Sequence, residues 1–167
     1  MVLDFLIGLV DTFGYVGVFL GSLIGSASIL LPVPSFLFVI LAGKLLNPFF
    51  VGILAGLGAA IGELTAYGVA LGILKLKKQR KKKIKKERNL LQSLHKWFKG
   101  RWGPVIIFIF AITPLPDDII GLYCGAIRYD IKKFFIATLI GKVLLGLMLA
   151  YAGLYGIDFI INLYTGQ

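Results

Sequence analysis

A short proline pattern occurs twice in this chain and restricts how the chain can fold. Pro32–Pro34 is followed nine residues later by Gly43, and Pro114–Pro116 is followed at the same distance by Gly125. Both copies lie in apolar sequence, where a proline pair breaks a helix because it removes backbone donors and clashes with the preceding turn. In lipid, such a break survives only where the freed backbone groups are buried in protein or line a wet cavity. Duplicated breaks are typical of transporters built from repeats, so the sequence predicts a membrane protein that moves something.

The composition agrees with a membrane setting. Hydrophobic residues make up 58% of the 167 positions, and the mean hydropathy is +0.90, whereas soluble domains have roughly 45–50% apolar residues. The apolar runs 49–74 and 131–155 are each long enough to cross about 30 Å of hydrocarbon as helices. We therefore expect an all-α integral membrane protein.

Positive charge is concentrated in one segment between the apolar runs. Residues 75–101 contain 13 Lys or Arg residues and one acid, for a net charge of +12, whereas the rest of the chain has a net charge of −2. In a soluble protein this run would suggest nucleic-acid binding. Between membrane segments, the positive-inside rule explains it as a cytoplasmic loop that touches anionic headgroups. We expect a plasma-membrane protein with this loop in the cytoplasm, and no nucleic acid as a partner.

The proline breaks divide the apolar sequence into two similar halves. In the second half, the runs 104–113 and 119–127 are too short to span, so we expect a re-entrant hairpin before the spanning helix. Basic residues lie on both sides of this hairpin, whereas Lys44 alone follows the first one, which predicts opposite insertion of the halves. The predicted fold is a single membrane domain over residues 1–167, an inverted repeat of two re-entrant helical hairpins that are each followed by a transmembrane helix. Its parts are a first repeat at 13–74, a basic cytoplasmic loop at 75–101 and a second repeat at 102–156.

These features resemble the DedA superfamily, also called the VTT or SNARE-associated Golgi protein family. The matching residues are the first hairpin ending in Ala42-Gly43, the stretch Gly62-Glu63-x-x-x-Tyr67-Gly68, and the second hairpin ending in Gly125 and followed by Phe134-Phe135. The resemblance covers roughly 13–153. It implies a membrane protein with inverted re-entrant hairpins that moves lipids between leaflets. Family members act on polyprenyl-phosphate carriers in bacteria and as phospholipid scramblases in eukaryotes.

The chain departs from the bacterial pattern of this family at both hairpins. Bacterial members carry a glutamate just after the first Pro-x-Pro, where this chain has Phe36. They also carry arginines near the second tip, where this chain has Ala111 and Asp117. These differences indicate a divergent short member, for which the bacterial substrate and proton coupling do not transfer directly.

Charges within the apolar sequence are the candidate site. Glu63 and Lys142 each follow a glycine near the middle of a spanning run, where a charge costs about 2.5–3.5 kcal/mol and is usually paired or faces water. We expect them to approach each other or the opposing hairpin tips. They form either an architectural ion pair or part of a polar path for a headgroup or proton.

Three further charged residues lie around the second hairpin. Asp117 and Asp118 follow the proline break, where one can cap the next helix. Because adjacent carboxylates repel, the other can hold a proton or cation. The planar guanidinium of Arg128 suits Asp117 or a lipid phosphate, and simple interfacial anchoring with Lys132 and Lys133 is the alternative.

The leading hypothesis is therefore lipid translocation through polar hairpin tips, in the manner of a scramblase or flippase for a phospholipid or a polyprenyl-phosphate carrier. The alternatives are a proton- or ion-coupled transporter for a small solute and a membrane scaffold that recruits a partner through its basic loop. No nucleophile–base set or nucleotide-binding motif occurs, and one cysteine and one histidine cannot build a conventional metal site. We expect no enzyme, cofactor or metal. The spacing of Gly14, Gly17, Gly21 and Gly25 predicts close helix contact and makes a homo-oligomer reasonable.

Overall fold

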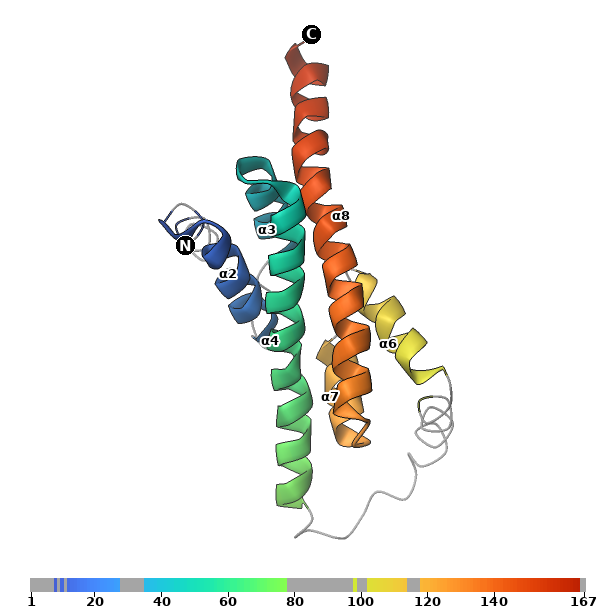
Figure 1. Ribbon diagram of the computed structural model, residues 1–167. Helices are drawn as coiled ribbons and strands as arrows, with labels where there is room; N and C mark the ends of the chain where they lie inside the picture. Colours follow the sequence, from blue (N-terminus) through green and yellow to red (C-terminus); the bar gives the residue numbers. More distant parts are fainter. Residues whose placement is uncertain are drawn as a thin grey trace.

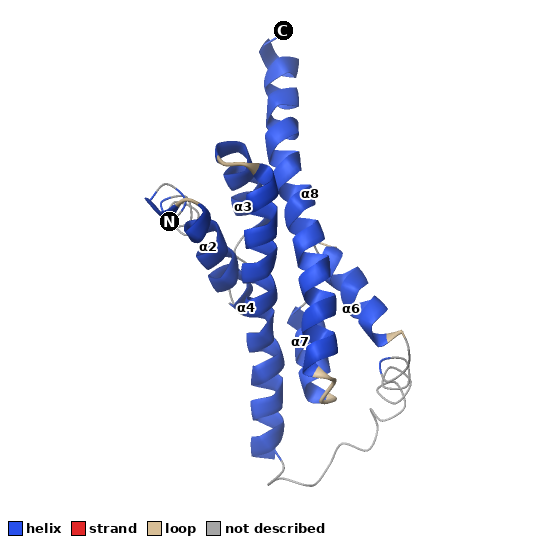
Figure 2. Cartoon of the chain, viewed as in Figure 1, coloured by secondary structure: helices blue, strands red, loops and turns tan. Residues whose placement is uncertain are grey.

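The computed structural model describes residues 12–27, 35–77, 102–113 and 118–165, together with positions 8, 10 and 98. Its regular structure in these residues is all helical, as Figures 1 and 2 show. The helices are α2 (Tyr15–Ala27), α3 (Ser35–Leu45), α4 (Pro48–Lys77), α6 (Gly103–Ile112), α7 (Asp118–Ala126) and α8 (Ile131–Thr165). The prediction of an all-α protein is confirmed.

Helices α4 and α8 form the central pair of the fold. Pro48–Ile73 and Ile131–Gly156 are each 26 residues long and apolar enough to cross a membrane, since such a helix is about 39 Å long. The two helices run antiparallel (Figure 1) and meet through glycines, with Gly52 against Leu147 and Gly56 against Val143. A side chain at either glycine would collide with the opposing backbone, so glycine permits the close approach that membrane helices use in place of hydrophobic burial.

The outer face of α8 is apolar between Ile136 and Tyr155. Large side chains recur there every three or four residues and are exposed; they are Ile136, Ile140, Leu144, Met148, Tyr151 and Tyr155. A continuous exposed stripe of this kind is unfavourable in water, whereas lipid tails solvate it. The stripe therefore agrees with a membrane setting for α8.

The four shorter helices lie along opposite halves of the central pair. In Figure 1, α2 and α3 accompany the half near the start of α4, and α6 and α7 accompany the half near the start of α8. The longest of them, α2, has 13 residues and a length of about 20 Å, too short to span. It begins after Gly14, whose φ of 54° interrupts the helix. The predicted tip residues Pro32, Pro34, Pro114, Pro116 and Asp117 lie outside the described residues.

Corresponding glycines make corresponding contacts in the two halves. Gly43 of α3 packs against the backbone of Ala150 in α8, and Gly125 of α7 packs against the backbone of Tyr67 in α4. The second short helix of each half therefore lies on the long helix of the other half. The first short helices instead pack on their own long helices, α2 on α4 and α6 on α8.

Local sequence signals explain where these helices begin and end. Asn47 accepts a hydrogen bond at Oδ1 from the Phe49 N–H at 3.0 Å, and Pro48 is the first residue of α4. Asparagine before a helix and proline in its first turn are residue types that suit these positions. At the end of α6, Thr113 is extended, with φ −93° and ψ 147°, because a following proline disfavours the helical conformation.

The end of α8 differs from the predicted apolar run, which ended at residue 155. Helix α8 continues without interruption to Thr165. Gly156 weakens a helix by about 1 kcal/mol relative to alanine, but no proline follows it, so nothing stops the helix there.

Candidate functional site

The centre of the fold contains a buried ion pair between α4 and α8. Lys142 Nζ lies 3.4 Å from Glu63 Oε2, and the two side chains are only 10% and 4% exposed. Both residues lie near the middle of the candidate spans. The expectation that these charges approach each other is confirmed. Pairing is what such a depth requires, because a lone buried charge would be strongly destabilising.

Three of the short helices reach this ion pair with their inner ends. Gly121, in the first turns of α7, lies against Glu63, and Gly62 lies against Ala27 at the end of α2. On the other side, Gly141 of α8 lies against Ala111 near the end of α6. Three helix ends thus lie beside Glu63 or beside the glycine that precedes each charge, and helix ends carry the free backbone groups that a polar path needs.

Ala111 also explains one departure from the bacterial pattern. Its side chain is 2% exposed and fills the contact between α6 and α8 beside Gly141. A larger side chain at this position would push the two helices apart. The place where bacterial relatives are expected to carry an arginine is therefore a helix contact in this chain.

Two buried hydroxyls, one of them a helical turn from Lys142, were missed by the sequence analysis. Ser22 Oγ on α2 and Thr138 Oγ1 on α8 have no hydrogen-bond partner among the described residues. Buried polar atoms are normally paired, and an unpaired one costs about 1–3 kcal/mol. Thr138 lies one helical turn before Lys142, and that spacing was the signal in the sequence. These hydroxyls add hydrogen-bonding capacity to an otherwise apolar interior.

Two of the charged residues predicted around the second hairpin, Asp118 and Arg128, lie in the described part of the chain. Asp118 is the first residue of α7, and Asp117 lies outside the described residues. Arg128 follows the opposite end of this nine-residue helix, about 13 Å from Asp118 along the axis. The structure therefore places Arg128 away from Asp118, at the outer turn between α7 and α8.

Arg128 has an unusual backbone conformation in this turn. Its φ is 54°, a left-handed conformation normally taken by glycine at the end of a helix. The turn closes through hydrogen bonds from the Arg128 N–H to the Gly125 carbonyl at 3.2 Å and from the Tyr129 N–H to the Cys124 carbonyl at 2.9 Å. This is the Schellman pattern with arginine where glycine is usual, and the conformation costs about 1–2 kcal/mol.

We expect Arg128→Gly to raise the free energy of unfolding by about 1 kcal/mol, because glycine adopts this conformation without strain. Arg128→Ala is the matched control, since it removes the same charge and keeps the strain. Denaturant titration of both variants in micelles measures the difference. Equal stability of the glycine and alanine variants would contradict the inferred backbone strain at position 128.

Asp130 fixes the start of α8 beside this turn. Its Oδ1 accepts hydrogen bonds from the backbone N–H groups of Lys132 at 2.9 Å and Lys133 at 3.2 Å. The bond from Lys133, followed by that from Lys132 and the charges of both lysines, lowers the pKa of the Asp130 carboxyl. This carboxylate is therefore ionised at neutral pH and acts as the helix cap.

Comparison with known proteins identifies the family of this chain. The VTT domain matches residues 33–155. The chain belongs to the VTT domain family. The match begins after α2 and includes the ion pair, α6, α7 and most of α8. VTT proteins are linked to membrane lipid handling and are generally not catalytic enzymes.

A distant relative of this VTT protein occurs in an archaeon. An uncharacterized protein of Methanocaldococcus jannaschii is 28% identical over 146 residues, which cover 84% of each chain. No solved structure matches the chain. Among the residues that the structure describes, no group of His, Cys, Asp and Glu could hold a metal ion. Together with the two candidate spans, the family indicates a membrane protein.

Proposed function

We propose that this VTT protein translocates lipids between membrane leaflets, with the headgroup passing the Glu63–Lys142 ion pair. The observation that carries this proposal is the burial of that pair at the middle of both candidate spans, beside the inner ends of three short helices. The link of the family to membrane lipid handling supports it.

In this proposal, α2–α3 and α6–α7 are re-entrant hairpins that enter the membrane from opposite faces. Their short lengths support this arrangement, as do the corresponding glycine contacts of the two halves. The repeats then occupy 13–74 and 102–156, with the 75–101 loop and the turn at 127–130 both on the cytoplasmic side. Membrane lipids are the partners, and the loop contacts anionic headgroups.

The chemistry of the ion pair suits a zwitterionic headgroup. Such a headgroup carries a phosphate and an ammonium cation, so Lys142 can pair with the phosphate while Glu63 pairs with the cation. The exchange moves no net charge and needs no proton. Asp117, Asp118 and Arg128 then provide contacts on the way to and from the centre, and the hydroxyls of Ser22 and Thr138 replace water around the phosphate.

A purely anionic lipid such as a polyprenyl phosphate makes a different demand. Its phosphate pairs with Lys142 but brings no positive charge for Glu63, so uptake of a proton by Glu63 would keep the charges balanced while the lipid passes. The same requirement applies to an anionic solute in a proton-coupled transporter, which is the alternative function. Dependence on a pH gradient therefore separates zwitterionic from anionic substrates.

Proteoliposomes with headgroup-labelled lipids test the proposal. We expect the native chain to move labelled phosphatidylcholine without an imposed gradient, and the Asp117→Asn/Asp118→Asn variant to move it several-fold more slowly. Asp130→Asn is the matched control, because asparagine keeps the cap and the residue lies in an exposed outer turn. Failure to move any lipid, with or without a pH gradient, would favour solute transport or a scaffold role.

A further inference from the structure

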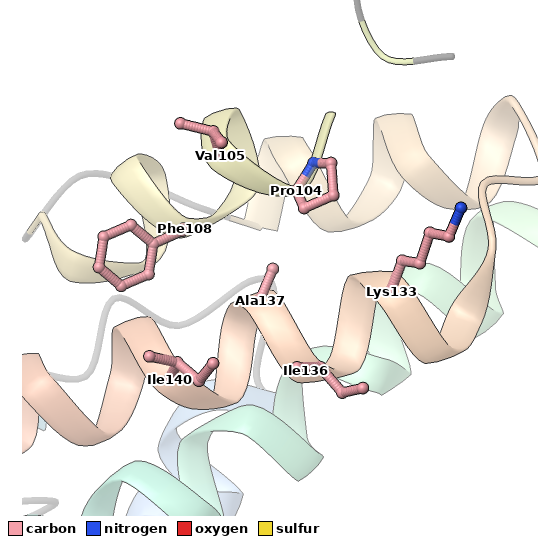
Figure 3. A pocket seen from close by; sticks show the side chains of 7 residues that line it. All are labelled: Pro104, Val105, Phe108, Lys133, Ile136, Ala137 and Ile140. Carbon is pink, nitrogen blue, oxygen red and sulfur yellow. The ribbon is translucent and has the colours of Figure 1, made fainter. Parts of the chain in front are cut away.

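A groove lies between α6 and α8 on the surface of the protein. Its volume is about 340 Å³, within the range of small-molecule sites. Figure 3 shows Pro104 and Phe108 of α6 on one side and Ile136, Ala137 and Ile140 of α8 on the other. These lining side chains are apolar, and the charged side chain of Lys133 lies at one end.

The groove has a closed inner end and a charged outer end. At the inner end, α6 and α8 touch where Ala111 meets Gly141. Lys133 lies in the first turn of α8, near the start of the candidate span, and Ile140 lies about 10 Å further along the helix. The groove thus extends from the membrane surface toward the hydrocarbon centre as far as Ile140.

The ammonium group of Lys133 is available to an anion at this outer end. Lys133 is exposed, and among the described residues its side chain makes no ion pair. The nearby Asp130 carboxylate accepts hydrogen bonds from the backbone rather than the side chain of Lys133. Lys132, the neighbouring exposed lysine, does not line the groove.

We propose that this groove binds one acyl chain of an anionic phospholipid whose phosphate contacts Lys133. Its apolar walls match a hydrocarbon chain, and the single cation matches a phosphate at membrane-surface depth. The occupant comes from the bilayer, because Ile136 and Ile140 at the rim are 55% and 49% exposed on the lipid-facing stripe of α8. The proposal rests on the membrane placement in the proposed function. It adds a site for an anionic lipid on the lipid-facing side of α8, separate from the path past the ion pair, where a zwitterionic headgroup is expected.

Photo-crosslinking of the full chain in nanodiscs tests this site. A benzophenone amino acid replaces Ile140 at the inner end of the groove, or Ile61 as the control. Ile61 is 39% exposed on α4, and the antiparallel contacts of α4 and α8 place it at a similar depth. The nanodiscs contain equal amounts of phosphatidylglycerol and phosphatidylcholine with identical acyl chains, and mass spectrometry identifies the adducts.

We expect phosphatidylglycerol adducts at position 140 to exceed phosphatidylcholine adducts about fivefold, the effect of one lysine at an anionic headgroup. Position 61 should show equal yields. Lys133→Gln should abolish the preference at position 140, whereas Lys132→Gln, the same change on the neighbouring lysine, should retain it. Neither lysine is needed to cap α8, because Asp130 binds backbone groups only.

Several results would overturn the site. They are equal lipid yields at position 140, equal effects of the two lysine substitutions, and adducts to another part of the same chain or to a second copy instead of lipid. The translocation assay is read separately. A retained lipid preference without translocation would refute the proposed function but support the groove as a lipid site. Translocation without a lipid preference would support the proposed function but refute the groove as a lipid site.

Discussion

Glu63→Gln is expected to lower the free energy of unfolding by about 3–5 kcal/mol, although it removes one charge and almost no volume. The reason is Lys142, which stays only 10% exposed and loses the carboxylate that compensates its burial. Lys142→Met removes the ammonium that faces Glu63 and should lower the free energy of unfolding by a similar amount. Denaturant titration in micelles measures both losses.

The double variant Glu63→Gln/Lys142→Met separates stability from transport. It buries no charge, so most of the lost stability should return, as it does when buried ion pairs are replaced by neutral side chains. Lipid translocation should nevertheless fall about a hundredfold, because a headgroup charge uncompensated at mid-membrane costs about 2.5–3.5 kcal/mol and each 1.36 kcal/mol is tenfold in rate.

The charge-swapped variant Glu63→Lys/Lys142→Glu provides the control for that experiment. It keeps one cation and one anion at the same depth, so a zwitterionic headgroup should still find partners and translocation should partly recover. If the neutral double variant moves lipid at the native rate, the ion pair serves architecture only and the proposed path is wrong.

The sequence predicted the helix breaks and the central charges because these have local causes. Thr113 is extended because proline follows it, and Asn47-Pro48 begins α4 because each residue suits its position at a helix start. The cost of burying either charge alone predicted that Glu63 and Lys142 approach each other or the hairpin tips, and the structure shows the first of these.

The sequence could not predict which faces of the helices pack together. In lipid, the buried and the lipid-facing sides of a helix are both apolar, so hydrophobic periodicity does not distinguish them. The glycines of α2 illustrate this. Gly17 and Gly21 are buried in the chain, on a helix that packs against α4, so their spacing needs no second copy to explain it. The groove at Lys133 could not be predicted from the sequence either, because it depends on how far α6 and α8 diverge.

Gly125→Ala is expected to lower the free energy of unfolding by about 1–3 kcal/mol, the usual cost of overpacking. An added methyl group would collide with the backbone of Tyr67 in α4, which cannot move as a flexible side chain can. Gly43→Ala should cost a similar amount, because it meets the backbone of Ala150 in α8 in the corresponding way. Gly72→Ala is the matched control, since nothing lies within 4 Å of its added methyl group. It should stabilise α4 by about 1 kcal/mol.

The comparison of these three variants also tests how the two halves hold each other. The second short helix of each half packs on the long helix of the other half. If these contacts hold the halves together, Gly43→Ala and Gly125→Ala should both destabilise the protein. Both should also slow translocation, because either one shifts a hairpin relative to the ion pair. A loss confined to one of them would show that only one hairpin is held this way. If both behaved like Gly72→Ala, the crossed contacts would be loose, and the ion pair alone would have to join the halves.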